Sequence, residues 1–293
     1  MLGGGGVLGE AWLRALLSGL EHERGWDLRA CDAFVGTSAG SIVAATLAAG
    51  RRPEAAAGIA GAWEDAAGGA REPGRGAGAL RQIGRLAGAA AAPAAPLVAA
   101  GLEPGGAALR AAVLRRGRRA TREIPRLRDA LARMPGGFDG RLRVAAVDLG
   151  SGRRVVFGAP GAPEASVTDA VLASCAVPWV FRPVAIGGRE YVDGGVWSAA
   201  NLDAAPVSKG TEVLCLNPTA SPRLSADRFG AVRAFAGTTA AAEALVLRSR
   251  GARVRTVAPD AASVAAIGPN LFDARRRPQV EAAGYAQGRA LAA

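Results

Sequence analysis

The feature that most constrains this chain is the segment FVGTSAGSIVAATLAAG at residues 34–50. A short apolar stretch enters GTSAG at residues 36–40, and an apolar stretch without proline follows it. The pattern G-x-S-x-G at such a junction is typical of a nucleophile elbow, a sharp turn from a buried strand into a helix. We therefore predict that Gly36 and Gly40 let strand and helix pack closely around Ser38. An ordinary glycine-rich turn with a helix-capping serine is the alternative.

Strand and helix patterns alternate along much of the chain. Residues 9–25 carry apolar side chains at helical spacing, residues 142–158 predict a β-hairpin, and TEVLCLNP at residues 211–218 predicts a buried strand. Helices are expected directly after the elbow and near residues 167–174. This alternation predicts an α/β fold, a three-layer sandwich with a mostly parallel central sheet.

The chain is long enough for one large α/β domain, and we predict a single domain over residues 1–293. Residues 66–135 are rich in Ala, Gly, Pro and Arg and are predicted to form a helical insertion or lid. Residues 220–293 are predicted to be mostly helical. A parallel sheet also needs a strand before the first glycines, yet only Met1 and Leu2 stand there. We expect that strand to be truncated or to begin upstream.

The charge is strongly positive, with 36 Lys and Arg against 25 Asp and Glu. The densest cluster is LRRGRRATREIPRLRD at residues 114–129. Its pattern favours a solvated helical face, and peripheral contact with an anionic membrane is the alternative. No nucleic-acid partner is expected, because the cluster has no interleaved aromatic residues and no recognisable nucleic-acid motif.

The three cysteines, Cys31, Cys175 and Cys215, are too widely spaced for a zinc pattern or a disulfide framework. We expect buried, reduced thiols and a cytoplasmic protein, since no secretory signal pattern is visible. The longest uncharged run, at residues 86–102, is alanine-rich and interrupted by two prolines. It is too short and too weakly apolar for a membrane span.

A serine nucleophile needs a base. The only histidine, His22, precedes Ser38, which excludes the order serine, acid, histidine of the α/β hydrolases. It lies near the end of the first predicted helix, where an imidazole complements the helix dipole. A carboxylate is the remaining candidate. Asp193 follows a short strand and precedes Gly194 and Gly195, which let the backbone pass close to another element. A common Asp-Gly turn is the alternative.

The chain opens with the glycine loop GGGGVLG at residues 3–9. Bare backbone N–H groups at the start of a helix bind an anion, either a nucleotide phosphate or the oxyanion of a tetrahedral intermediate. Gly4, Gly6 and Gly9 also fit the dinucleotide pattern G-x-G-x-x-G. That pattern requires an acidic residue at the end of the second strand, whereas Asp32 begins its predicted strand. The oxyanion interpretation is therefore favoured.

Taken together, GGGGVLG, GTSAG and DGG resemble the motifs of the patatin-like phospholipase family. The segment ASCAVPWVFRPV at residues 173–184 is similar to the family's Ala-Ser-x-Ala-x-Pro-x-x-Phe-x-Pro segment. The resemblance covers about residues 1–205. It implies a patatin-like fold that hydrolyses acyl esters of lipids through an acyl-enzyme, with a Ser–Asp dyad and no catalytic histidine. The residues so implied are the nucleophile Ser38, the base Asp193, the oxyanion-hole amides of Gly4, Gly5 and Gly6, and the supporting glycines Gly9, Gly36, Gly40, Gly194 and Gly195.

The resemblance implies a lipid or other acyl-ester substrate, and the chemistry needs no metal or cofactor. Because an unperturbed aspartate with a pKa of about 3.9 is a poor base, we expect a desolvated pocket that raises the pKa of Asp193. Leu8 departs from the family, which usually has Arg or Lys at this position. The missing cation motivates the alternative of a catalytically weak or inactive lipid-binding protein with the same fold.

Overall fold

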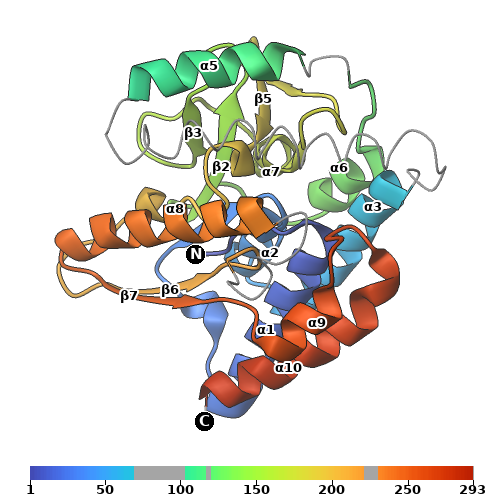
Figure 1. Cartoon of the computed structure of the whole chain (residues 1–293), viewed down its shortest axis with the longest axis vertical. Coiled ribbons are helices and arrows are strands. Elements are labelled where there is room, and N and C mark those ends of the chain that lie inside the picture. Colours follow the sequence, from blue (N-terminus) through green and yellow to red (C-terminus); the bar gives the residue numbers. More distant parts are fainter. Residues whose placement is uncertain (69–102, 117–119, 221–229, 293) are drawn as a thin grey trace.

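The computed structural model describes residues 1–68, 103–116, 120–220 and 230–292 (Figure 1). Its strands are β1 (Phe34–Thr37), β2 (Leu142–Asp148), β3 (Arg154–Phe157), β4 (Val184–Ile186), β5 (Arg189–Asp193), β6 (Glu212–Leu216) and β7 (Arg253–Val257). Its α-helices are α1 (Gly6–Arg24), α2 (Ala39–Ala48), α3 (Ala56–Gly68), α5 (Glu103–Arg116), α6 (Pro125–Ala132), α7 (Val167–Cys175), α8 (Gly230–Ser249), α9 (Ala261–Ile267) and α10 (Arg277–Ala292).

The centre of the sheet is parallel. β1 pairs with β2 and β6 pairs with β7 in parallel, while β3, β5 and β4 add antiparallel pairs on the β2 side. Leu2 joins the two groups through parallel bridges to Gly36 of β1 and Leu216 of β6. The strand expected before the glycine loop is therefore reduced to a single bridging residue in this structure.

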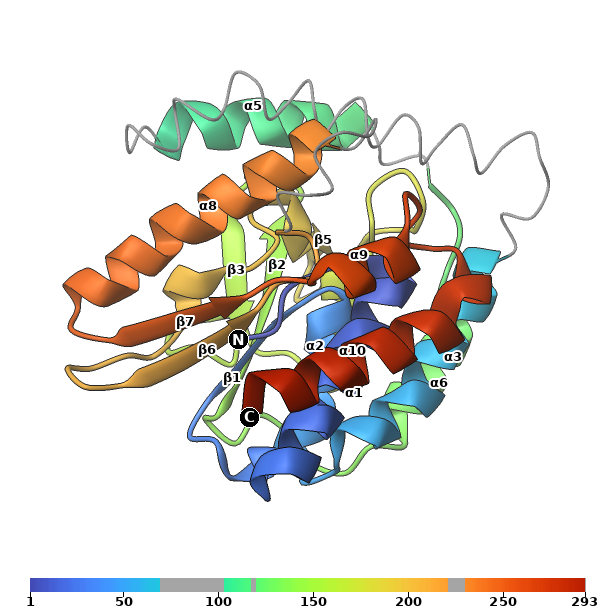
Figure 2. The same cartoon turned by 60° about the horizontal axis from the view of Figure 1, so that its bottom comes forward.

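Helices cover both faces of this sheet. On one face α2 contacts β1, α7 contacts β2 and β5, and α10 packs along α1. On the other face α8 contacts β7, and α5 lies on the same side (Figure 2). Alternate side chains of β2 pack on opposite faces of the sheet, because successive side chains of a strand point in opposite directions. Val144 joins the core beside α2, whereas Val147 clusters with Leu114 of α5.

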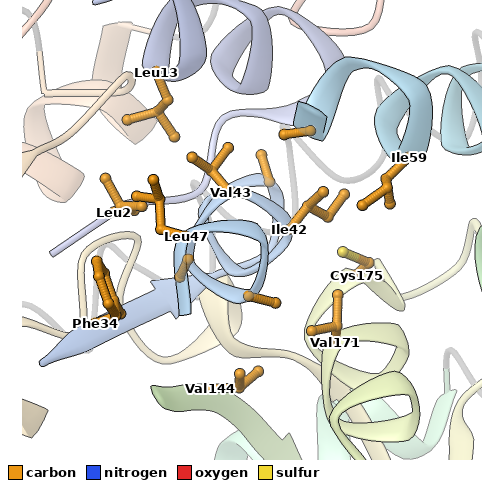
Figure 3. Packing of buried hydrophobic residues seen from close by; sticks show 14 of the residues in the cluster. Leu2, Leu13, Phe34, Ile42, Val43, Leu47, Ile59, Val144, Val171 and Cys175 are labelled. Atoms are coloured by element: carbon orange, nitrogen blue, oxygen red, sulfur yellow. The ribbon is translucent and has the colours of Figure 1, made fainter. Parts of the chain in front are cut away.

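The helix that follows the elbow lies at the centre of the larger core. Every residue of α2 from Ala39 to Leu47 is buried, as expected for a helix that is apolar on all sides. Ile42, Val43 and Leu47 point into neighbouring apolar side chains (Figure 3). Each such side chain stabilises the fold by about 1.5–3 kcal/mol, so the turn that carries Ser38 is fixed to a helix whose residues 39–47 are all buried.

The predicted α/β sandwich with a mostly parallel central sheet is confirmed, and so is the hairpin, formed by β2 and β3. The predicted insertion spans residues 66–135, of which residues 69–102 and 117–119 lie outside the described residues. Part of the arginine cluster at residues 114–129 also lies outside them. The remainder of the insertion includes α5 and α6. The C-terminal part contains β7 as well as helices α8, α9 and α10.

None of the described helices is long and apolar enough to cross a bilayer. The uncharged run at residues 86–102 lies outside the described residues. All three cysteines are free thiols, and Cys175 and Cys215 are buried as predicted. The prediction of burial is wrong for Cys31, which is exposed because it lies in the loop that precedes β1.

Candidate active site

Ser38 lies in the sharp turn between β1 and α2. Its backbone has φ 51° and ψ −123°, a region that L-residues other than glycine rarely occupy. Such a conformation costs on the order of 1–3 kcal/mol and persists only where the surroundings enforce it. Here the buried strand and the buried helix on either side enforce it. The predicted elbow is therefore present, with its serine strained.

The glycines on both sides of Ser38 are required by close backbone approaches. A Cβ atom at Gly36 would lie 2.5 Å from the Ser41 Cα atom, inside the first turn of α2. A Cβ atom at Gly40 would lie 2.0 Å from the carbonyl oxygen of Leu2. Any side chain at either position would push helix and sheet apart, as the sequence pattern predicted.

Asp193 meets Ser38 directly. The Ser38 side chain lies beside the Asp193 carboxylate and lowers its pKa, and the Gly195 N–H donates to Asp193 Oδ1 at 2.7 Å. Both side chains are almost completely buried, with 5% of Ser38 and 6% of Asp193 exposed. Burial raises the pKa of Asp193 to about 6, and the Ser38 side chain and the Gly195 N–H oppose part of that rise.

The sheet brings these two residues together through β2. Thr37, the last residue of β1, is paired with Ala145, and Asp193, the last residue of β5, is paired with Ala146. The ends of β1 and β5 therefore lie against consecutive residues of one strand. The elbow then turns Ser38 toward Asp193, although 155 positions separate them in the sequence.

The segment ASCAVPWVFRPV holds both residues by their backbones. Ser174 Oγ accepts the Ser38 N–H at 2.8 Å and donates to the Ala145 carbonyl at 2.7 Å. The Ala176 carbonyl accepts the Asp193 N–H at 3.0 Å. Sequence analysis identified the segment by resemblance but assigned no role to Ser174. Its position in that motif was the available signal.

Asn201 is a second residue that sequence analysis missed. It is fully buried, and its Nδ2 atom lies 3.0 Å from Thr37 Oγ1, 3.3 Å from the Gly194 carbonyl and 2.6 Å from the Ser198 carbonyl. It thus links the residue before Ser38 to the residue after Asp193. Asn201 has a positive φ of 48°, a conformation that asparagine tolerates better than most residues.

A buried carboxylate from α8 supports the loop that carries Asn201. Glu243 accepts the Leu202 N–H at 2.8 Å, and the Ser198 side chain lowers the pKa of Glu243. Burial, and then the nearby Asp203 carboxylate, raise the pKa of Glu243 to about 7. No motif marks Glu243 in the sequence, so this contact is visible only in three dimensions.

The glycine loop lies beside Ser38, with one correction to its predicted role. A Cβ atom at Gly4 would lie 3.3 Å from Ser38 Cβ, so the loop is next to the serine. The Gly4 N–H, however, donates to the Ala199 carbonyl at 2.8 Å. The assignment of the Gly4 amide to an oxyanion hole therefore does not fit this structure. Among the described residues, no acceptor is found for the N–H groups of Gly5 and Gly6, which open α1.

The other predicted glycines are also sites of close packing. A Cβ atom at Gly9 would lie 3.2 Å from Pro218 Cβ, and one at Gly194 would lie 2.4 Å from the Ala145 carbonyl oxygen. Leu8 is fully buried in the core. Its side chain therefore packs against apolar neighbours and brings no charge to the site.

His22 is remote from Ser38. It lies near the end of α1, where its Nδ1 atom and the Tyr285 hydroxyl are 2.6 Å apart. At about 1.5 Å per residue, it is about 24 Å from Gly6 at the start of the same helix. The described part of the chain holds no cluster of three or more His, Cys, Asp or Glu residues able to bind a metal.

A family model described as Patatin-like phospholipase matches residues 1–206. The chain belongs to the patatin-like phospholipase family. The matched region includes the glycine loop, the elbow and Asp193, whereas Glu243 lies beyond it. Membership of the patatin-like family supports lipid acyl hydrolysis as the general activity of this protein.

Proposed function

We propose that this patatin-like protein is a serine lipid acyl hydrolase, of the phospholipase A or esterase type, with a Ser38–Asp193 dyad. The observation that carries the proposal is that the Ser38 side chain lies beside the buried Asp193 carboxylate and lowers its pKa. A carboxylate with a pKa of about 6 is ionised at neutral pH and yet accepts a proton more readily than an ordinary aspartate.

In the acylation step, Ser38 Oγ forms a bond to the acyl carbonyl carbon while its proton passes to Asp193. The tetrahedral intermediate collapses as the ester C–O bond breaks, and the proton on Asp193 passes to the departing alkoxide. In deacylation, a water molecule gives its proton to Asp193 and attacks the acyl-enzyme. Ser38 then leaves with that proton, and a carboxylic acid is released.

The N–H groups of Gly5 and Gly6 are the proposed donors to the oxyanion. They have no acceptor among the described residues, and they lie at the positive end of the α1 dipole. One such donor contributes about 3 kcal/mol to transition-state stabilisation in other hydrolases. Two donors would supply much of the acceleration that an aspartate base alone does not.

Turnover of p-nitrophenyl esters and of phosphatidylcholine tests this function. Ser38→Ala and Asp193→Asn should each lower kcat by about three orders of magnitude or more. Exposed residues of the same types provide matched controls: Ser249→Ala and Asp129→Asn should keep full activity. Turnover that is undetectable in folded wild-type protein would instead favour the inactive lipid-binding alternative.

A further inference from the structure

A cleft of about 640 Å³ lies away from the Ser38 site. Ser38 follows the last residue of β1, whereas Ala30 and Cys31, which line the cleft, precede its first residue. The other walls are the end of α1, β6 with β7, and Leu291 of α10. None of the residues assigned to the dyad or the glycine loop lines this cleft.

The inner surface of the cleft is apolar. Four leucines from separate parts of the chain meet there: Leu20 of α1, Leu28, Leu214 of β6 and Leu291. Leu20 and Leu28 are buried, while the other two are half-buried. Trp26 also lines the cleft and is 49% exposed, which is unusual for so large an apolar side chain in this structure. Such a surface favours a ligand with a hydrocarbon part.

The charged side chains of the cleft leave an excess of positive charge. They are Arg24, Asp27, Glu212, Arg253 and Arg255. Asp27 is paired with Arg29 at 2.7 Å, and Glu212 is paired with Arg253, its register partner on β7, at 2.7 Å. Within the described residues, Arg24 and Arg255 have no carboxylate partner. Arg24 lies over the Trp26 ring, 5.8 Å from its centroid.

We propose that this cleft binds a long-chain carboxylate, that is, a free fatty acid. The hydrocarbon chain covers the leucines, and the carboxylate pairs with Arg255 and Arg24, because guanidinium groups form paired hydrogen bonds with carboxylates. The volume lies in the range of small-molecule sites. Hydrolysis of a lipid ester would release the same class of molecule, but the proposal rests on the cleft alone and not on the reaction at Ser38.

Calorimetric titration of the full chain with laurate, below its critical micelle concentration, tests the proposal. The titration uses the Ser38→Ala variant, so that laurate binding is measured independently of any hydrolysis at Ser38. One saturable site is expected. Arg255→Ala and Arg24→Ala should each weaken binding roughly tenfold, whereas Arg133→Ala, a change at an exposed arginine on the end of α6 outside the cleft, should leave it unchanged. Dodecyltrimethylammonium, with the same chain and the opposite charge, should not compete.

Three results would overturn the proposal. The first is the absence of saturable laurate binding. The second is laurate binding that stays intact in the Arg24→Ala, Arg255→Ala double variant, or that is lost when a fluorophosphonate is attached to Ser38 in the wild-type chain. Either result would mean that laurate occupies another site. The third is a double variant that no longer associates with phosphatidylglycerol vesicles but still binds laurate. This result would identify the cleft as a membrane-contact surface.

Discussion

Ser38 and Asp193 are each held in a state that the isolated amino acid avoids. Ser38 has a strained backbone, and Asp193 is a carboxylate whose burial raises its pKa to about 6. Sequence analysis could predict both features, because G-x-S-x-G specifies the turn and the chemistry of an aspartate base requires desolvation. The hydrogen bond from the Gly4 N–H to the Ala199 carbonyl could not be predicted, because it depends on how two distant loops pack against each other.

The strain at Ser38 predicts a difference between two inactive variants. Ser38→Gly and Ser38→Ala both lose the hydroxyl group, but only glycine adopts this backbone without strain. After allowance for the greater entropy of glycine in the unfolded chain, Ser38→Gly should be more stable than Ser38→Ala by about 1 kcal/mol. Urea denaturation measures the difference. Equal free energies of unfolding would mean that the elbow is relaxed in solution.

The raised pKa of Asp193 predicts the pH dependence of activity. In the proposed mechanism Asp193 must be ionised to accept the Ser38 proton, so kcat/KM should rise with pH and level off above an apparent pKa of about 6. Initial rates from pH 4.5 to about 8.5 give the profile. Glu243→Gln serves as a control and should keep the same acidic limb. An apparent pKa of about 4, the ordinary value for an aspartate, would contradict the proposed desolvation of Asp193.

At the scale of elements, β2 aligns the ends of β1 and β5, and α8 supports the loop that ties those ends together. The strands β1, β2, β3, β5 and β6 could be predicted from their apolar pattern, whereas β4 and β7 were not predicted. The order of strands could not be predicted, because pairing partners far apart in the sequence leave no local signal. Glu243 is an example: it lies 50 positions after Asp193 and accepts the Leu202 N–H, next to Asn201, whose amide donates to Thr37 and to Gly194.

Replacement of Glu243 tests this support. Glu243→Leu leaves the Leu202 N–H without its acceptor in the interior, which should cost about 1–3 kcal/mol of unfolding free energy. The loosened loop should also lower kcat more than it changes KM. Glu243→Gln keeps an acceptor oxygen and should retain most of both properties. A Leu variant with wild-type kcat would show that α8 has no part in positioning the dyad.

At the scale of the whole molecule, the chain beyond the family match completes the structure. Leu216 of β6 bridges to Leu2, and Trp12 Nε1 donates to Gln287 at 2.9 Å. Glycines allow α1 and α10 to pack closely: a Cβ atom at Gly288 would lie 2.2 Å from the Leu16 carbonyl oxygen. The helical character of this part could be predicted from sequence, but its packing against the first helix could not.

These contacts predict that residues 1–206 do not fold alone. Truncation after residue 206 removes β6, the bridge at Leu216 and α10, and it exposes the apolar side of α1 to water. Circular dichroism should show no cooperative thermal transition for the fragment, whereas the full chain should unfold in one transition. Two separate transitions in the full chain would contradict the prediction of a single domain over residues 1–293.

The central claim is that Asp193 makes the Ser38 hydroxyl a nucleophile, and covalent capture by a fluorophosphonate tests it most directly. Peptide mass spectrometry of the labelled wild-type protein should find one adduct, on Ser38, and Asp193→Asn should label far more slowly under the same conditions. An unlabelled protein that is demonstrably folded, or an adduct on Ser174 or Ser198 in place of Ser38, would contradict the account.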